Sequence, residues 1–410
     1  MPALSSSLIS PALEQLRDLR AGARPLHPGE CPSLAECLQQ VPDPRDPRGV
    51  RHSLTSLLLA SVAAVLAGAQ SLAAAGEWVA DAPPQVLAAL GIRRDPLTGR
   101  FQPPAEATIR RVLEPVDAGA LEAAVGSWLA ARLQASDQRS QRGRRARRAL
   151  AVDGKAVRGT RHASGDGQAA HLLAIADQQA SAVLAQASVH GKTNEITAFA
   201  PLLEPLDLAG CVITADAMHT QREHAQFLVS DKHAHYILVV KRNQPSLYAQ
   251  VKNLPWRHIP AGDQQRDRGH GREERRTLQA ATVAGLAFPH AAQAIRVTRR
   301  IRPLSAGKKW RTFTIYAITS LTASQAAPAR LAEWIRGHWQ IEALHHIRDV
   351  TYREDASQIR TGSGPQVMAA LRNLVIGIFK LAGARNIAAA CRRHARDATR
   401  VLTTLGLSSQ

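Results

Sequence analysis

The stretch WIRGHWQIEALHHIRDVTYREDASQIRTG (334–362) decides how the rest of this 410-residue chain is interpreted. Its spacing predicts a helix that carries Glu342, because residues three, four and seven apart share one helix face. That face also carries other polar side chains: His338, His345, His346 and Asp349. Trp334, Ile341 and Leu344 fall towards another side, where they would pack the helix against a core. A carboxylate fixed on such a helix can bind a metal ion if further carboxylates reach it from elsewhere in the chain.

Two aspartates follow apolar runs, which makes them candidates for those further carboxylates. Asp153 follows such a run in ALAVDGKAVRGT (149–160), and Asp216 does so in GCVITADAMHTQ (210–221). If the two runs are neighbouring strands, both carboxylates meet at one place, where they repel each other unless a cation lies between them. A single aspartate after a strand is more commonly a turn or cap residue, so the hypothesis depends on the three acids occurring together.

The expected metal is magnesium, with manganese as the second choice. Magnesium prefers oxygen ligands, uses few protein carboxylates and completes its shell with water and phosphate. Two such ions about 4 Å apart activate an attacking oxygen and stabilise the leaving oxygen in phosphodiester cleavage. The expected chemistry is therefore metal-dependent cleavage of a phosphodiester, without a small-molecule cofactor.

The charge of the chain indicates a polyanionic partner. Lysine and arginine number 52 against 33 acidic residues, which gives a formal net charge of +19. Nucleic acid is the simplest partner for such a protein. The alternative is a solvated basic surface that follows from an Arg-rich and Ala-rich composition.

Compartment and membrane signals favour a cytoplasmic protein. The N-terminal residues have no basic segment followed by a hydrophobic one, which predicts no secretion signal. Residues Leu54 to Ala75 are uncharged over 22 positions, but Ser, Thr, Gln and many Ala residues make them weakly hydrophobic. They are interpreted as a buried pair of helices, with no membrane partner. The four cysteines form no CxxC pair and no zinc-ligand spacing, so a reducing compartment is expected.

The order of patterns along the chain predicts an α/β protein with seven segments. They are a flexible lead (1–30), an α-helical domain (31–135), an Arg-rich linker (136–148), the first part of a catalytic sheet domain (149–244), a β-rich insertion (245–322), the last catalytic helices with Glu342 (323–385) and a basic tail (386–410). The α-helical domain could bind DNA or only pack on the next domain, and the sequence leaves these two alternatives open. The Arg-rich linker is a solvated tether or, opposite a polyanion, a clamp.

From about residue 34 to residue 385 the chain resembles the DDE-class insertion-sequence transposases, in the branch that includes the H-repeat-associated proteins. The resemblance rests on motifs in one order: VPDPRDPRGVRH (41–52), EATIRRVL (106–113) with a following Asp117, LAVDGKAVRGT (150–160), HGKTNEI (190–196), VITADAMHTQ (212–221), YILVVKRNQP (236–245), GHGREERR (269–276), YAITSL (316–321), the 336–362 stretch and LRNL (371–374).

This resemblance implies a ribonuclease-H-like catalytic domain, with a mixed sheet and flanking helices. It also implies a β-rich insertion before the last helix and an α-helical region at the N-terminus. Asp153, Asp216 and Glu342 would then be the catalytic, metal-binding triad.

The implied function is that of a DNA transposase. Such an enzyme cleaves double-stranded DNA at the element ends and joins the 3′-hydroxyl to target DNA. A homodimer on DNA is expected, because two ends must be joined, and the site of action would be the nucleoid in a bacterial cytoplasm. Two alternatives remain open: a stand-alone metal-dependent nuclease of the same fold, and a transposase relic that binds DNA without activity.

The chain departs from the wider group with β insertions, in which Tyr, Arg and Lys flank the catalytic glutamate. Counted from Glu342, those positions hold Ile335, His338 and Asp349. Phosphate contacts are therefore expected from other residues, with Arg336, His338 and Arg348 as candidates. Asp349 is expected to pair with Arg353, with a further metal-facing carboxylate as the alternative.

Further DNA contacts are expected from polar residues near the strand ends. These candidates are Lys155, Lys192, Asn194, Lys241, Asn243 and Gln244, together with Arg272 in the GHGREERR hairpin tip. Glu195 is either an acid behind the metal ligands or a helix-start residue stabilised by the helix dipole. Trp310 and Trp256 are more often core residues than stacking platforms for an unpaired base.

Overall fold

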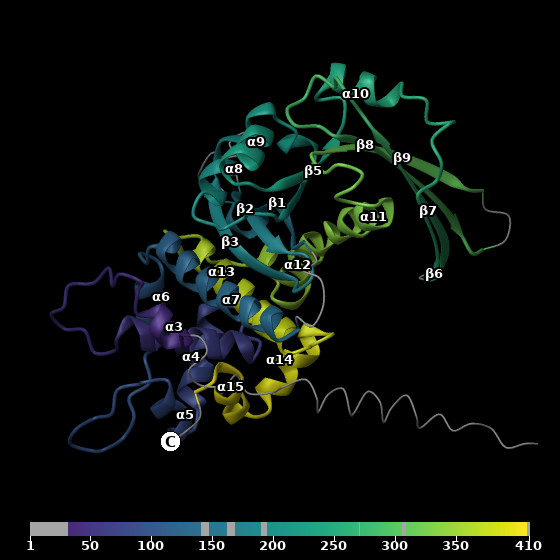
Figure 1. Cartoon of the computed structure of the whole chain (residues 1–410). Coiled ribbons are helices and arrows are strands. Elements are labelled where there is room, and N and C mark those ends of the chain that lie inside the picture. Colours follow the sequence, from purple (N-terminus) through teal and green to yellow (C-terminus); the bar gives the residue numbers. More distant parts are fainter. Residues whose placement is uncertain are drawn as a thin grey trace, which may run out of the picture.

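The computed structural model describes residues 32–140, 147–161, 169–189, 195–269, 271–305 and 309–407. The segment predicted as a flexible lead, 1–30, lies outside these ranges. Figure 1 shows a helical half at the lower left, a sheet above it, and strands that extend from the sheet to the right.

The N-terminal region is helical, as predicted. Its helices are α2 (Leu34–Leu38), α3 (Leu54–Leu66), α4 (Leu72–Asp81), α5 (Pro84–Ala89), α6 (Glu106–Leu113) and α7 (Ala118–Ser140). Helix α3 begins where the Ser53 side chain accepts from the backbone N–H of Ser56, a typical N-cap. All of its residues except Thr55 are buried, which confirms that the uncharged run is a core helix. In the part of the chain that the structure describes, no helix has the length and apolarity needed to cross a membrane.

The central sheet is mixed. Its first five strands are β1 (Ala149–Val157), β2 (Ala170–Asp177), β3 (Ala182–Val189), β4 (Val212–Ala215) and β5 (His235–Val240). They lie in the order β3-β2-β1-β4-β5. Strands β1, β4 and β5 are parallel, whereas β2 and β3 run antiparallel to their neighbours. The connections contain α8 (Glu195–Leu203), α9 (Arg222–Gln226) and a π-helical turn (Phe227–Asp231).

The segment after β5 extends the same sheet. It contains α10 (Pro245–Lys252) and the antiparallel strands β6 (Asp263–Gly269), β7 (Arg272–Thr282), β8 (Gln293–Pro303) and β9 (Arg311–Thr319). Strand β9 pairs with β5, and the order continues β9-β8-β7-β6. We call β6–β9 the arm. The strand-rich character predicted for 245–322 is thus present, and Trp256 lies buried at the base of the arm.

The C-terminal helices return to the helical half. They are α11 (Pro328–Gly337), α12 (Trp339–Thr351), α13 (Gly364–Leu381), α14 (Ile387–Ala395) and α15 (Ala398–Leu405). The single helix predicted from residue 334 is divided at His338 into α11 and α12. Residues 386–410 were predicted as a basic tail, and most of that segment instead forms α14 and α15. Apolar side chains at helical spacing bury these helices: Ile387, Cys391, Val401, Leu402 and Leu405.

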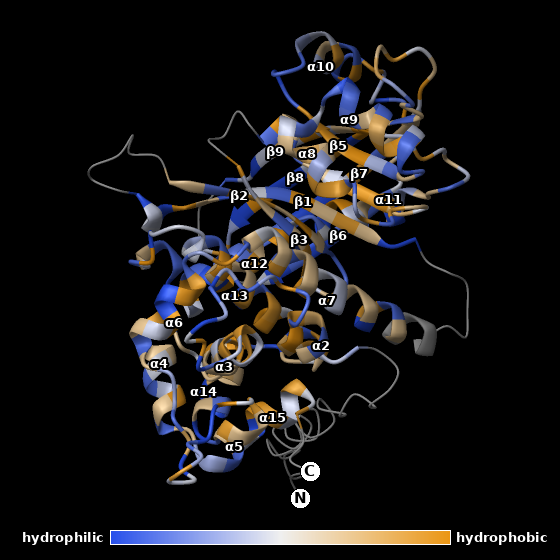
Figure 2. Ribbon diagram, turned by 90° about the vertical axis from the view of Figure 1, so that its left-hand side faces the viewer, coloured by the Kyte–Doolittle hydropathy of each residue, from blue (hydrophilic) through white to orange (hydrophobic). Residues whose placement is uncertain are grey.

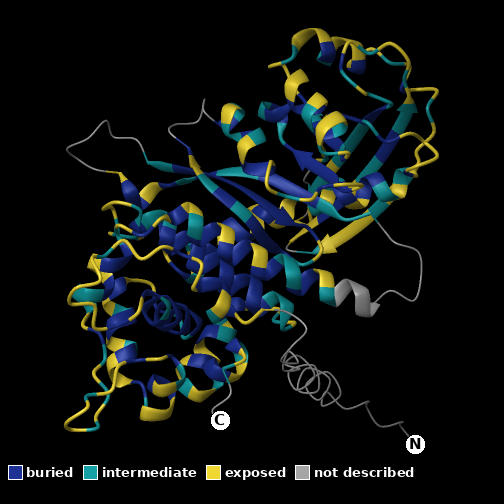
Figure 3. Ribbon diagram, turned by 60° about the vertical axis from the view of Figure 1, so that its left-hand side comes forward, coloured by how far each residue is buried: buried dark blue, intermediate teal, exposed yellow. Residues whose placement is uncertain are grey.

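Two hydrophobic clusters cover opposite faces of the sheet. One joins α2–α7 and α12–α15 to Ala151, Ala174 and Val183 on the sheet. The other joins Val152, Leu173 and their neighbours to α8 and α9. Figure 2 shows apolar segments where α12 and α13 pass beneath the sheet, and Figure 3 shows buried ribbon at the same place with exposed loops around it. The N-terminal helices therefore share a core with the C-terminal helices.

Candidate active site

The sheet register places Asp153 and Asp216 side by side. In the parallel pair of β1 and β4, Val152 is the partner of Ala215, and the residue that follows each of them in the chain is one of the two aspartates. Neighbouring strands lie about 4.8 Å apart, so the two carboxylates start from adjacent positions. Strand β4 ends at Ala215, whereas β1 continues to Val157 along β2. Asp153 therefore lies within its strand and not at its end.

Both aspartates face the side of the sheet that α12 covers. Side chains alternate along a strand, so Asp153 shares its face with Ala151, whose partner across the ladder is Thr214. Helix α12 packs against β1 on this side. Its His345 Nδ1 lies 3.5 Å from Asp153 Oδ2, and Glu342 lies one helical turn earlier. The structure thus brings the helix of Glu342 onto the strand of Asp153.

The electrostatics indicate carboxylates whose charge is not balanced. Burial, together with the negative charges of Asp216, Glu342 and Glu195, raises the pKa of Asp153 to about 7. The pKa of Glu342 is also raised by partial burial of its carboxyl group, although the residue as a whole is exposed. Burial lowers the pKa of His345 to about 3, so this imidazole is neutral and cannot neutralise Asp153.

Such a cluster fits a divalent cation that brings water and phosphate as further ligands. Among the described residues, no group of three or more His, Cys, Asp or Glu side chains is closed tightly enough to hold a metal ion by itself. Oxygen-only carboxylate ligands on an open face suit magnesium or manganese better than zinc.

His338 holds the junction of α11 and α12 against β4. Its Nδ1 lies 3.0 Å from the Thr214 hydroxyl, which donates to the Leu150 carbonyl and accepts from Gln178. With its hydroxyl proton used in this way, Thr214 can accept from His338, so Nδ1 carries the proton. Burial lowers the pKa of His338. Of the two ring nitrogens, Nε2 is then the one without a proton, and it is a hydrogen-bond acceptor.

Lys155 is directed inward. It lies on the same face of β1 as Asp153 and is 8 % exposed. Its ammonium lies 2.7 Å from Asp349 and 3.5 Å from Asp355. The pairing expected between Asp349 and Arg353 is therefore wrong. Arg353 follows the end of α12 in a left-handed conformation, φ 49°, so the helical spacing of four residues no longer applies to it.

Arg348 is fully buried, which corrects its expected contact with phosphate. Its guanidinium lies 2.7 Å from Glu354, which also pairs with Arg372 at 3.0 Å. It also donates to Gln186 on β3. We call Lys155, Arg348, Arg372, Asp349, Glu354 and Asp355 the buried ion cluster, in which three cations face three carboxylates. It ties α12 to β1, β3 and α13.

Other candidates near the strand ends have different surroundings. Asn243 donates to the Ala217 carbonyl at 2.6 Å, and Gln244 donates to the Thr220 carbonyl at 2.9 Å. Both amides thus brace the turn that follows Asp216. Lys241 is exposed at the end of β5. Lys192 and Asn194 lie outside the described residues.

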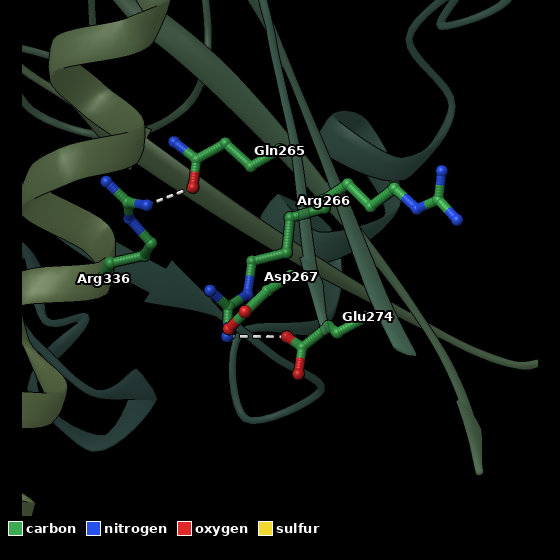
Figure 4. Close-up of a pocket in the computed structure, with 6 residues that line it drawn as sticks. Gln265, Arg266, Asp267, Glu274 and Arg336 are labelled. Atoms are coloured by element: carbon green, nitrogen blue, oxygen red, sulfur yellow. Dashed lines mark hydrogen bonds and ion pairs between the residues drawn. The ribbon is translucent and has the colours of Figure 1, made fainter. Parts of the chain in front are cut away.

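The arm supplies basic residues close to α11. Figure 4 shows Arg336 of α11 directed at Gln265 of β6, across a pocket of about 340 Å³. The pocket is lined by Gln265, Arg266, Asp267, Glu274, Arg276 and Arg336. Arg272, at the start of β7, is half-exposed and lies 3.7 Å from Glu274.

The sequence did not single out Trp339. This indole is 58 % exposed, one helical turn before Glu342, and the Arg299 guanidinium lies 5.7 Å from its ring centre. The sequence contains a pattern that indicates its exposure: Trp339 is three residues before Glu342, on a polar face of the helix, where no apolar core is expected. Trp310 instead lies among the guanidinium groups of Arg275, Arg300 and Arg302.

Comparison with known proteins identifies the family of this chain. The Transposase DDE domain matches residues 144–378, and the DDE_Tnp_1-associated region matches residues 35–129. The putative transposase YncI of Escherichia coli O157:H7 is 29 % identical over 362 residues, which cover 85 % of this chain and 87 % of that protein. The H repeat-associated putative transposase YhhI of Escherichia coli K12 is 29 % identical over 365 residues, with 85 % and 91 % covered. The domain match spans more than half of the length of this chain, and the chain therefore belongs to the DDE transposase family.

Proposed function

We propose that this protein is an insertion-sequence transposase that cleaves DNA at the element ends and joins the 3′-hydroxyl to target DNA. The observation that carries the proposal is the register of β1 and β4, which places Asp153 beside Asp216 under the helix of Glu342. The catalytic fold proposed is ribonuclease-H-like. The strand order β3-β2-β1-β4-β5, with β1, β4 and β5 parallel, supports it, and the arm would then be an insertion before α11.

Asp153, Asp216 and Glu342 are proposed to hold the metal ions. Magnesium or manganese bound there would supply activation of the attacking oxygen and stabilisation of the leaving one. The chain's own residues fix the geometry: the sheet ladder holds the two aspartates, and the buried ion cluster holds α12. Positioning and fixed charge, without a protein nucleophile, would then lower the barrier.

Double-stranded DNA is the proposed substrate, bound along the face of the arm next to α11 and α12. Residues paired across neighbouring strands share a face, so Gln265, Arg276, Arg299 and Phe313 form one row across β6–β9. Arg336 and Trp339 lie on the helices opposite this row, close to Glu342. Arginines suit phosphates, and an exposed indole under a guanidinium suits the face of a base. Of the other candidates, Lys241 and Arg272 remain proposed contacts with the DNA backbone.

Two protomers are proposed to act together in the bacterial cytoplasm, because transposition joins two element ends. The Arg-rich segment 136–148 adds charge for binding the DNA backbone, which predicts strong salt dependence.

The test is a reaction of the purified protein with labelled DNA that carries the flanking ends of its own element, in magnesium or manganese. We expect nicks at the ends and joined products, and loss of both in Asp216→Ala. The matched control is Asp231→Ala, an exposed aspartate on the same domain, which should retain both. Nicks without joined products would favour a nuclease, and DNA binding without either would favour a relic. Full activity of Asp216→Ala would contradict the assigned site.

A further inference from the structure

A buried carboxylate lies behind the proposed metal site. Glu195, the first residue of α8, is only 1 % exposed. One of its carboxylate oxygens contacts Nε2 of His171 on β2, and its other oxygen lies 3.7 Å from His219 Nε2. A buried charge is costly unless it is paired, so two histidine partners at one glutamate call for a specific role.

Glu195 lies on the reverse face of the sheet from Asp153. His171 is the strand partner of Ala156, which shares the face of Gly154, and that face alternates with the face of Asp153. The carboxyl group of Glu195 occupies the place where a side chain at 154 would begin. A Cβ added to Gly154 would lie 2.5 Å from its carboxyl atoms. The glycine after Asp153 is thus what allows the carboxylate to approach the β1 backbone.

His219 connects the same carboxylate to Asp216. It lies in the short helical turn Ala217–His219, which Asp216 caps by accepting from the Met218 N–H at 2.8 Å. In the described parts of the chain, neither ring nitrogen of His219 has a hydrogen-bond partner, although the residue is 1 % exposed. Its ring packs against Phe199 of α8, with ring centres 5.0 Å apart. Glu195 is therefore the polar group that this buried imidazole faces.

The charge state of Glu195 agrees with this arrangement. Burial alone would raise its pKa, but the neighbouring side chains of His171 and His219 outweigh burial and lower the pKa to about 2. The carboxylate is ionised at neutral pH, and its charge adds to the repulsion that Asp153 experiences.

We infer that Glu195 is a positioning residue that connects β1 to the turn after β4 at the metal site. It contacts the β1 backbone at Gly154, next to Asp153, and through His219 it holds the turn of Asp216, while His171 fixes the carboxylate from β2. The separation of Asp153 and Asp216, on which the affinity for a divalent cation depends, follows from these contacts. This inference rests on the proposed function, since it takes the two aspartates as metal ligands.

The test measures binding of Mn²⁺ to the full-length protein without DNA, by electron paramagnetic resonance of the free ion. Removing a residue that supports metal ligands typically costs 10–100-fold in affinity, and we expect a loss of about this size in Glu195→Ala. Glu195→Gln should stay within about threefold of the wild type, because the amide can accept from one histidine and donate to the other. Glu204→Ala, an exposed glutamate just beyond α8, is the matched control and should bind as the wild type does.

A second variant tests the contact with β1. In Gly154→Ala the new Cβ displaces the Glu195 carboxylate, and the affinity for Mn²⁺ should fall as in Glu195→Ala. In the double variant the Cβ occupies the vacated space, so the two losses should not add. Thermal unfolding of each variant distinguishes a local effect from loss of the fold.

Several results would overturn the inference. Glu195→Ala could bind Mn²⁺ within twofold of the wild type, Glu195→Gln could lose as much as Glu195→Ala, or the losses at 154 and 195 could add fully. Asp216→Ala separates this failure from failure of the proposed site. If Asp216→Ala loses Mn²⁺ binding and Glu195→Ala does not, only the positioning role is wrong. If neither loses binding, the metal site itself is wrong.

Discussion

Two groups of charges lie next to each other along α12, where it packs on β1, and they differ in how their charges are balanced. In the buried ion cluster, Arg348 and Arg372 flank Glu354, and Lys155 lies beside Asp349. At the candidate active site, Asp153 lies beside Asp216 with a neutral His345 as its neighbour. Balanced buried charges hold elements together, whereas unbalanced ones make a site that is complete only with a cation. The same helix thus takes its position from one group and delivers Glu342 to the other.

The largest expected effect comes from removing an acid of the active site. Asp153→Asn should reduce end nicking in magnesium by on the order of 10³-fold, because the fixed charge that the reaction depends on is lost. The fold should persist, since the substitution also removes a repulsive charge. Nicking rates measured beside Asp231→Asn check this, and a loss below tenfold would assign Asp153 a minor role.

Breaking the balance of the buried ion cluster should affect stability instead. Arg348→Ala leaves Glu354 with part of its charge unpaired in the interior, which costs about 3–5 kcal/mol of unfolding free energy. Chemical denaturation measures this. Arg330→Ala, which removes an exposed pair with Glu333, should cost less than about 1 kcal/mol. Equal losses in the two variants would show that the cluster does not stabilise the fold.

The raised pKa of Asp153 predicts how pH acts on metal binding. A carboxyl with a pKa of about 7 keeps its proton below that pH, and a cation must displace it. The apparent affinity for Mn²⁺ should therefore fall as pH decreases below 7, by up to about tenfold per unit. Titrations of the protein with Mn²⁺ between pH 5.5 and pH 8 test this. An affinity that does not change with pH would contradict the raised pKa of Asp153.

The raised pKa of Asp153 also makes the stability of the metal-free protein depend on pH. Because the pKa of Asp153 in the folded protein exceeds its value in the unfolded chain, the folded state binds more protons between about pH 4 and pH 7. The contribution of Asp153 to stability should therefore decrease as pH rises through this window. Chemical denaturation at both ends of this window gives the change of unfolding free energy with pH for the wild type and for Asp153→Asn. The same change in both proteins would contradict the prediction.

The smallest effect is expected on the arm. Arg276→Ala should weaken DNA binding moderately and reduce the dependence of log Kd on log salt by about one unit, because it removes about one phosphate contact. Binding of a labelled duplex at several salt concentrations measures the slope. Arg330→Ala serves again as the control, and an unchanged slope in Arg276→Ala would remove this residue from the proposed DNA surface.

The sequence predicted those features that follow from local pattern. Apolar runs before Asp153 and Asp216 predicted buried strands, and apolar spacing around Glu342 predicted a helix packed on a core. The uncharged run 54–75 predicted a buried pair of helices, because it has too many polar side chains for a membrane helix. Each of these expectations needs only the period of side chains along one element.

What the sequence could not predict depends on partners from distant segments. Lys155 and Arg348 carry the positive charge expected of DNA contacts, but in the fold they form ion pairs with Asp349 and Glu354 and are buried. The pairing of Asp349 with Arg353 was predicted only from their separation of four residues. That separation brings two side chains together only within a helix, and α12 ends at Thr351, before Arg353. Residues 386–410 were predicted as a tail because they are basic. Their apolar residues recur at helical spacing, and most of the segment forms α14 and α15.

Asp153 and Asp216 are proposed to hold a divalent ion between them. The most direct test is anomalous diffraction from crystals of the full chain grown with Mn²⁺. We expect an anomalous peak about 2.2 Å from a carboxylate oxygen of each aspartate, on the face of the sheet that α12 covers. A peak at other residues, or none at an Mn²⁺ concentration that supports DNA nicking, would contradict it.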